Sequence, residues 1–280
     1  MSEPNNNLSR RAMLKKSGIA TATVAAATLP VNAIGDVGHK TPRWVMVMDL
    51  RRCIGCRACT VACKAENNVA LGSFRAVIQE KTVGTFPDVK KVFLPIMCNH
   101  CDGNEKDKIP PCVRACPEYP GERAVFITAD GLKIRYRTGA TYKRPDGMIL
   151  LDNAQCIGCG LCIKACPHGV RSFDPFKKAG QKPEENGINK CTFCQHLVDK
   201  GITPACITTC QGQARIFGDL NDPNSEVAKL IKQHGAEQNV LLPDKDTAPQ
   251  VFYIDPDNVL ATTYTERNGN DLSHFMDQIP

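Results

Sequence analysis

The sixteen cysteines of this 280-residue chain fall into four sets of four. The first and third sets have the spacing C-x2-C-x2-C-x3-C, in which three thiolates can surround one cubane of iron and sulfide while the fourth typically reaches a second cluster. The second and fourth sets are looser, with a C-x2-C pair, then ten or eleven residues, then a C-x3-C pair. In chain order the sets are Cys53, Cys56, Cys59, Cys63; Cys98, Cys101, Cys112, Cys116; Cys156, Cys159, Cys162, Cys166; and Cys191, Cys194, Cys206, Cys210.

The count and the regularity predict four [4Fe–4S] clusters, because four sets of four ligands leave no cysteine over. Small residues stand between several ligands, as at Gly55, Ala58, Gly158 and Gly160. They allow backbone amides to approach the cluster sulfurs. With a cysteine on every iron no position is open to a substrate, so electron transfer is the chemistry that the pattern favours.

Three other uses of the cysteines fit the spacing less well. Disulfides are disfavoured because cysteines separated by two residues are poorly placed for unstrained bridges. Structural zinc sites typically pair two C-x2-C knuckles across a longer loop, without the third and fourth cysteines of the tight sets. A radical enzyme that uses S-adenosylmethionine needs an iron without a protein ligand, and four cysteines per cluster leave none.

An internal repeat is visible in the order tight, loose, tight, loose, which indicates a duplicated two-cluster ferredoxin unit. Proline follows the last cysteine of the second and third sets (Pro117 and Pro167), whereas Lys64 and Gln211 follow the last cysteines of the outer sets. The matching ends favour a nested arrangement in which the middle sets exchange their fourth cysteines and the outer sets do the same. The residues alone leave the sequential alternative open, with sets one and two paired and sets three and four paired.

The first 33 residues are expected to be a twin-arginine signal peptide. Arg10 and Arg11 precede a weakly apolar run over Gly18–Leu29, and Val31-Asn32-Ala33 offers a cleavage site. This export route carries folded proteins, which suits a chain whose clusters are inserted before export. The expected location is therefore the periplasm. The alternative is a short N-terminal amphipathic helix that carries two arginines.

The composition disfavours two further classes of protein. The formal net charge is +6, yet no basic tract with interleaved aromatic residues indicates nucleic-acid binding. After residue 33 no apolar run approaches the ~18 residues that span a bilayer, so any membrane attachment is expected to come from a partner. Aromatic residues make up 6% of the chain, with 21 Gly and 19 Pro. This predicts a loop-rich protein that its clusters stabilise more than a large apolar core does.

Several short elements are expected to position the cysteines. Polar excursions are predicted at 102–111 and 177–187, and the tail beyond Pro243 is expected to wrap the surface or a partner. Strands are predicted over 44–50, 147–152 and 214–217, strands or loops over 74–78 and 89–96, a hairpin over 124–128 and 132–137, and helices over 55–65, 192–200 and 225–234.

Polar residues near the cysteines are expected to act on the clusters indirectly. His100 and His168 lie in or beside the sets, but no cysteine is missing for them to replace. They are expected either to hydrogen-bond cluster sulfurs or to face solvent. Four basic residues crowd the first set and are expected to raise its potential, guide an acidic partner or form a solvated basic face. They are Arg51, Arg52, Arg57 and Lys64.

The chain resembles the four-cluster iron–sulfur (beta) subunits of respiratory molybdoenzyme-type oxidoreductases, such as the tetrathionate, polysulfide and dimethyl sulfoxide reductases. The likeness covers residues 44–255, and four motifs carry it besides the cysteine frame. They are Asp49-Leu50-Arg51-Arg52-Cys53-Ile54-Gly55-Cys56, Cys98-Asn99-His100-Cys101-Asp102, Lys190-Cys191-Thr192-Phe193-Cys194 and Pro249-Gln250-Val251-Phe252-Tyr253.

The resemblance implies which cysteines hold each cluster, with the fourth cysteines exchanged in the nested way. The implied ligand sets are Cys53, Cys56, Cys59 and Cys210 for cluster one; Cys63, Cys191, Cys194 and Cys206 for cluster two; Cys98, Cys101, Cys112 and Cys166 for cluster three; and Cys116, Cys156, Cys159 and Cys162 for cluster four.

The resemblance also implies a role without catalytic residues. The clusters would relay electrons between a quinol-oxidising membrane subunit and a catalytic subunit of the molybdopterin type. The alternatives are a stand-alone periplasmic polyferredoxin or a partner of a multihaem cytochrome reductase of the nitrite or sulfite type. The spacer 102–111 and the apparent insertion 132–145 depart from the family pattern, which leaves the identity of the catalytic partner open.

The expected fold is α+β, a duplicated bacterial ferredoxin-like arrangement of two two-cluster units, with an inserted hairpin and loops and a C-terminal extension. The expected divisions are the signal peptide at 1–33, a first ferredoxin half-unit with covering strands at 34–97, a central ferredoxin-like unit with insertions at 98–190, a second half-unit that pairs with the first at 191–222, and a C-terminal helix and tail at 223–280.

Overall fold

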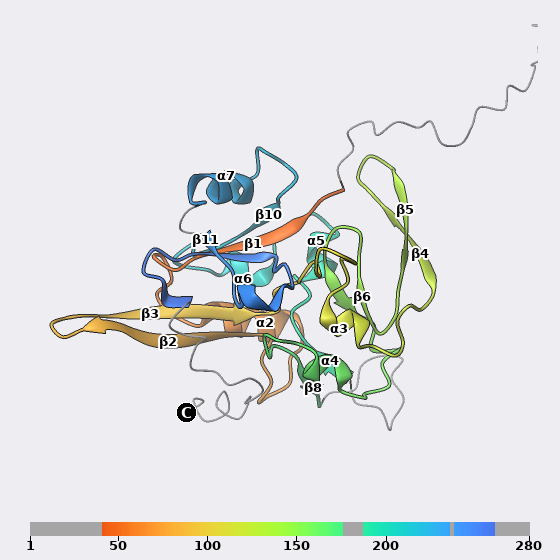
Figure 1. Ribbon diagram of the computed structural model, residues 1–280, viewed down its shortest axis with the longest axis horizontal. Helices are drawn as coiled ribbons and strands as arrows, with labels where there is room; N and C mark the ends of the chain where they lie inside the picture. Colours follow the sequence, from red (N-terminus) through yellow and green to blue (C-terminus); the bar gives the residue numbers. More distant parts are fainter. Residues whose placement is uncertain (1–40, 176–186, 236–237, 261–280) are drawn as a thin grey trace, which may run out of the picture. The chain divides into compact units, whose positions relative to one another are not determined.

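A four-stranded sheet joins the two ends of the cysteine-bearing region. In the computed structural model, which describes residues 41–175, 187–235 and 238–260, its strand order is β10-β1-β12-β11 (Figure 1). Strand β1 is antiparallel to β10 and parallel to β12. The strands are β1 (Trp44–Asp49), β10 (Arg215–Asp219), β12 (Val251–Ile254) and β11 (Gln238–Asn239).

Successive side chains of β1 enter two different cores, as expected for a strand that is covered on both faces. Met46 and Met48 belong to the large core that also contains several cysteines. Val45 and Val47 face the smaller core, where Val227 of helix α7 covers the sheet. Strand β1 is therefore held centrally just before the chain reaches its first cysteine.

Four antiparallel hairpins make up the rest of the β structure in the described part of the chain (Figure 1). Each joins strands close in sequence, so each can form from local pairing. They are β2 (Ala76–Thr85) with β3 (Asp88–Met97), β4 (Arg123–Ile127) with β5 (Lys133–Arg137), β6 (Thr141–Lys143) with β7 (Ile149–Leu151), and β8 (Ser172–Asp174) with β9 (Gly187–Asn189).

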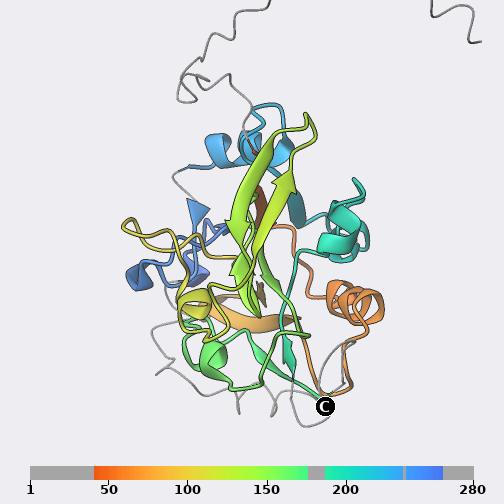
Figure 2. The same ribbon diagram turned by 90° about the vertical axis from the view of Figure 1, so that its right-hand side faces the viewer.

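Four of the helices carry cysteines, and these four pack in two pairs. Helix α2 packs against α6, and α3 packs against α4. Figure 2 shows α3 and α4, in yellow and green, next to each other. The helices are α2 (Ala58–Glu66), α3 (Pro111–Arg114), α4 (Leu161–Lys164), α5 (Gln195–Val198), α6 (Ala205–Thr208) and α7 (Glu226–Gln233), with a short 3-10 helix η1 (Pro243–Lys245).

Most of the predicted elements are confirmed, and the differences have local causes. The predicted helix over 192–200 begins only at Gln195, because Phe193 and Cys194 have positive φ angles of 54° and 51°. The predicted helix over 225–234 is confirmed as α7, where the Ser225 hydroxyl accepts a hydrogen bond of 3.2 Å from the Ala228 amide. The spacer predicted at 177–187 lies outside the described residues except at Gly187.

The expectation that the tail beyond Pro243 wraps the surface is wrong for residues 251–254. They form β12, a central strand, in which Val251 and Tyr253 are fully buried. The Tyr253 hydroxyl donates a hydrogen bond of 2.8 Å to the carbonyl of Pro95 in β3. The tail is therefore part of the scaffold that holds β1.

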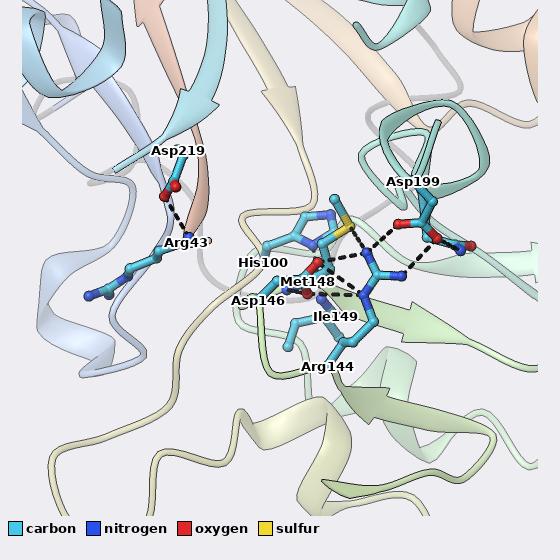
Figure 3. A network of polar contacts seen from close by, with 9 residues as sticks. Arg43, His100, Arg144, Asp146, Met148, Ile149, Asp199 and Asp219 are labelled. Carbon is cyan, nitrogen blue, oxygen red and sulfur yellow. Dashed lines mark hydrogen bonds and ion pairs between the residues drawn. The ribbon is translucent and has the colours of Figure 1, made fainter. Parts of the chain in front are cut away.

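A buried ion-pair network joins the β6–β7 hairpin to helix α5 (Figure 3). Arg144 donates to both carboxylate oxygens of Asp146 and to Asp199, with its shortest bonds at 2.6 and 2.7 Å. Burial would raise the pKa of Asp199, but the hydrogen bonds from Arg144 and Gln195 outweigh it and leave that pKa below its usual value. The positive charge of the buried Arg144 is thus neutralised by two carboxylates of the same chain.

We expect Arg144→Met to lower the free energy of unfolding by about 3–5 kcal/mol, because it leaves the fully buried Asp146 without its cation. The matched control is Lys91→Met, which removes the exposed pair with Glu80 on β2 and should cost less than about 1 kcal/mol. Urea unfolding under anaerobic conditions measures both. Equal losses would contradict a buried-network role for Arg144.

Candidate iron–sulfur centres

The fold brings the outer cysteine sets together at two neighbouring hollows. One is lined by three cysteines of the first set and the last cysteine of the fourth, and the other by the remaining members of these two sets. Helix α2 packing against α6 brings these segments together. The lining cysteines are Cys53, Cys56, Cys59 and Cys210 in the first hollow and Cys63, Cys191, Cys194 and Cys206 in the second.

The inner sets meet in the same manner where α3 packs against α4. A further hollow is lined by Cys116 together with Cys156, Cys159 and Cys162. The charges that act on the Cys101 thiol come from Cys98, Cys112 and Cys166, which places these four together as well. Each cysteine combination that the resemblance implies is thus gathered at one place.

These gatherings fit a cluster better than a single ion or disulfides. All sixteen thiols are free. Among residues 41–175, 187–235 and 238–260, no three His, Cys, Asp or Glu side chains are arranged to hold a lone metal ion. Four thiols around a hollow, each set drawn from two distant segments, suit a cubane with one cysteine per iron.

Buried polar atoms beside the thiols lack partners in the described chain, as expected if cluster sulfides accept from them. The ring of His100 accepts a hydrogen bond of 3.0 Å from the Ile149 amide at Nδ1, so the neutral ring carries its proton on the unpartnered Nε2 (Figure 3). His168 Nε2 lies 3.4 Å from the Cys101 sulfur. Of the two expectations for these histidines, burial rules out the solvent-facing one.

Burial also raises the pKa of most of these thiols. The pKa of Cys63 rises to about 12, through desolvation first and then through the negative charge of Cys206. The pKa of Cys191 is raised well above its usual value, again by burial first. A metal that binds these two thiols must therefore displace their protons.

A shared backbone turn opens each of the four sets. The second residue after the first cysteine has a positive φ in every case, at 70° for Gly55, 45° for His100, 72° for Gly158 and 54° for Phe193. In the fourth set this turn lets the Phe193 amide donate to the Cys191 sulfur at 3.4 Å. The small residues expected from the sequence account for this turn only in the tight sets.

The loose sets use aromatic rings where the tight sets use glycine. His100 and Phe193 stack at a centroid distance of 3.6 Å with 11° between the ring planes. Both are essentially fully buried. The stack joins the second and fourth cysteine sets, and through them the sites around Cys98 and Cys191.

Solvent reaches the four sites unequally. Cys56 and Cys159 are exposed, whereas the other fourteen cysteines are buried or half-buried. Exposed Ile54 flanks Cys56, and exposed Ile157 flanks Cys159. The two exposed cysteines belong to the first and fourth sites, so these two sites are more accessible to solvent than the second and third.

The basic residues near the first set divide into two groups. Arg51 pairs with Asp49 at 2.8 Å, and Lys64 donates to the carbonyls of Ala70 and Ser73. Arg52 and Arg57 are exposed beside the first hollow. A basic face therefore remains there, carried by Arg52 and Arg57.

Sequence reasoning missed three basic residues buried among the thiols, namely Arg171, Lys190 and Arg215. A signal for two of them was present. Arg171 and Arg215 each stand five residues after the last cysteine of their set, Cys166 and Cys210. Burial is decided by distant segments, however, and spacing does not reveal it.

No helix within the described residues is both long and apolar enough to cross a membrane.

Comparisons with known proteins agree with this geometry. A model described as a 4Fe-4S dicluster domain matches residues 89–220, and a 4Fe-4S binding domain matches residues 44–65. The B subunit of the tetrathionate reductase of Salmonella typhimurium is 36% identical over 265 residues, which cover 92% of each chain. The arsenate respiratory reductase iron-sulfur subunit ArrB of Shewanella sp. is 37% identical over 249 residues, 75% of this chain and 94% of the relative. The B subunit of the selenate reductase of Mesobacillus selenatarsenatis is 37% identical over 238 residues, 76% and 72% of the two chains.

The gathered thiols and the matching domains define a ferredoxin-type protein that binds [4Fe–4S] clusters within an α+β fold. The chain belongs to the family of iron–sulfur electron-transfer subunits, the B subunits, of reductase complexes. Its role is thus electron transfer, and it is not a catalytic subunit. The resemblance inferred from the sequence motifs is confirmed.

We expect Gly55→Ala to lower the free energy of unfolding by more than the cost of backbone strain alone. The left-handed backbone costs about 1–2 kcal/mol in any residue with a side chain. In addition, the new methyl group would lie 2.4 Å from the Phe93 ring and clash with it. Gly72→Ala is the control, since its φ is similar and nothing lies within 4 Å. Urea unfolding and iron content should show the larger loss for Gly55→Ala. Equal losses would refute a role for the Phe93 contact.

Proposed function

We propose that the chain carries four [4Fe–4S] clusters and relays electrons through them one at a time. The observation that supports this best is the nested gathering of thiols, since three hollows are each lined by four cysteines from two distant segments. The proposed ligands are Cys53, Cys56, Cys59 and Cys210 for cluster one; Cys63, Cys191, Cys194 and Cys206 for cluster two; Cys98, Cys101, Cys112 and Cys166 for cluster three; and Cys116, Cys156, Cys159 and Cys162 for cluster four.

The bound clusters would supply one-electron redox chemistry. The residues of the chain hold them, keep water from the inner sites and donate hydrogen bonds to sulfur. The His168 ring beside Cys101 and the Asn67 amide, 3.8 Å from the Cys63 sulfur, are two such donors. Since each site offers one cysteine for each of four irons, no iron is left for a substrate to bind.

Electrons are proposed to travel through the clusters in the order one, two, three, four. Met97 lines the second hollow and contacts Arg215 of the first, and Thr141 of the fourth hollow contacts Arg171, which donates to Cys112. The exposed cysteines lie at the two ends. Entry and exit at clusters one and four therefore need no opening of the fold.

The pairing of helices also supports the proposed duplication. The inner sets meet through α3 and α4, and the outer sets meet through α2 and α6. We propose that each pair is one ferredoxin-like two-cluster unit. The central unit falls within 98–190, and the other is assembled from 34–97 and 191–222, with 223–280 as the extension.

The proposed partners are a catalytic reductase subunit, of the molybdopterin type, and a quinol-oxidising integral membrane subunit. The relatives named as B subunits of tetrathionate and selenate reductases support a catalytic partner. The family resemblance adds the molybdopterin type and the membrane subunit. Contact with the membrane would then come through the partner.

Iron, acid-labile sulfide and zinc per chain test the cluster count on protein purified anaerobically. About sixteen irons and sixteen sulfides are expected, with four interacting EPR components after reduction. Zinc in place of iron, or sulfide near zero, would refute the proposal.

Paired substitutions test the proposed ligand sets. Cys53→Ala with Cys210→Ala should alter one EPR component, because both residues are assigned to cluster one. Cys53→Ala with Cys116→Ala should alter two. The sequential pairing of neighbouring sets reverses these results, since Cys53 and Cys116 would then share a cluster.

We further propose that residues 1–33, which lie outside the described residues, direct the folded chain to the periplasm by the twin-arginine route. The double substitution Arg10→Lys and Arg11→Lys should leave the full-length protein in the cytoplasmic fraction with its iron content unchanged. Lys15→Arg, in the same segment, serves as the control and should be exported. Equal export of both variants would contradict the signal.

A further inference from the structure

Three basic side chains are buried among the thiols without a carboxylate partner among the residues that the structure describes. Arg171 is 1% exposed, Lys190 0% and Arg215 3%. Within the described part of the chain, the charges that act on them come from thiols, a tyrosine and one another. Arg144 differs, since two aspartates neutralise it. The three cations therefore need another explanation.

Arg215 lies between the first and second sites. It lines the hollow of Cys53, Cys56, Cys59 and Cys210. Its Nη1 is 3.4 Å from the sulfur of Met97, which lines the neighbouring hollow together with Cys206. Its Nη2 is buried and makes no hydrogen bond to any described residue.

Lys190 lies between the second and third sites. It directly precedes Cys191, and its ammonium donates to the Cys191 carbonyl at 2.7 Å. It also donates to the carbonyl of Ile149, whose amide in turn donates to His100 of the second set. The thiols that act on it most strongly are Cys98 of the third site and Cys191 of the second.

Arg171 lies between the third and fourth sites. Its Nη2 donates to the Cys112 sulfur at 3.1 Å, at the third site. Its Nη1 donates at 3.3 Å to the hydroxyl of Thr141, which lines the hollow of the fourth. The charge of Cys162, in that fourth site, also acts on it.

An unpaired cation in a protein interior is costly unless an anion lies nearby. An oxidised [4Fe–4S] cluster with four cysteine ligands carries about two negative charges, and reduction adds a third. Anionic clusters on both sides would compensate each cation, and each cation would reduce the repulsion between its two neighbours.

We propose that Arg215, Lys190 and Arg171 are charge-compensating residues, one between each successive pair of clusters, that stabilise the reduced state of both neighbours. The inference rests on the proposed four-cluster function and adds to it a residue for each step of the chain. A fixed positive charge favours the more negative, reduced cluster and so raises its midpoint potential.

The test is an EPR-monitored potentiometric titration of the full-length, cluster-loaded protein. Arg215→Gln, Lys190→Gln and Arg171→Gln should each lower the midpoint potentials of two components and leave the other two unchanged. The proposal also fixes which EPR components the three variants shift in common. Lys190→Gln shares one component with each arginine variant, and the two arginine variants share none. This pattern can be tested without knowing which EPR component belongs to which cluster.

Two kinds of control separate charge from packing. Arg215→Lys, Lys190→Arg and Arg171→Lys keep the charge and should restore most of each shift. Arg52→Gln removes an exposed cation beside the first hollow and should produce a much smaller shift, since solvent screens it. One outcome is that a neutral variant fails to retain its clusters. In that case the proposal is supported if the charge-conserving variant at the same position does retain them. It is overturned if the charge-conserving variant loses its clusters as well.

Unshifted potentials in cluster-loaded neutral variants, or shifts spread evenly over all four components, would overturn the inference. The wild-type titration keeps this failure distinct from a failure of the proposed function. A wild-type protein without four components refutes the four-cluster proposal. Four wild-type components that the substitutions do not shift refute only the role of the three cations.

Discussion

The convergence of sixteen thiols, four at a time, from segments far apart in the chain is the constraint on which the rest of the structure depends. Cys63 and Cys206 can meet only if β1 and β10 are paired and α2 packs against α6. The thiols also occupy the centre of the apolar core, where Cys59 and Cys191 lie among methionine, leucine and valine side chains. Sheet, helix pairs and core therefore serve one purpose, which is to bring cysteines of distant segments to the same hollow.

Charge is the second constraint, and it ties the stability of this interior to its cofactors. The protein buries Arg171, Lys190 and Arg215 among thiols whose own charge burial suppresses. Arg144, buried beside Asp146 and Asp199, shows how the same fold neutralises a cation with protein groups alone. The chain thus contains two kinds of buried cation. The charge of one kind is neutralised by carboxylates of the polypeptide, and the charge of the other is proposed to be neutralised by bound anionic clusters.

The cysteine frame allowed the cofactor type to be predicted, and local sequence patterns allowed the α+β class and one hairpin to be predicted, because these depend on residues close in sequence. The strand at 44–49 and the hairpin of β4 and β5 are examples. Long-range pairing was not visible, so Val251–Ile254 was expected at the surface although it pairs with β1. The start of α5 was also missed, because the positive φ of Phe193 and Cys194 arises from the turn around the thiols and not from helix propensity. Likewise, burial of Lys190 depends on β7 and the second cysteine set, which spacing cannot reveal.

The nested meeting of the cysteine sets has a consequence for biosynthesis. The ribosome releases the chain from its N-terminus, so all residues of the inner pair have been made once Cys166 has emerged. The outer pair is incomplete until Cys210 follows, and β1 has no partner until β10 and β12 are translated. On the proposed ligand sets, clusters three and four can be completed once Cys166 has been made, whereas clusters one and two must wait until Cys206 and Cys210 have been made. A truncated chain would therefore expose unfilled thiols of its first set, which gives the cell a chemical mark of an unfinished molecule.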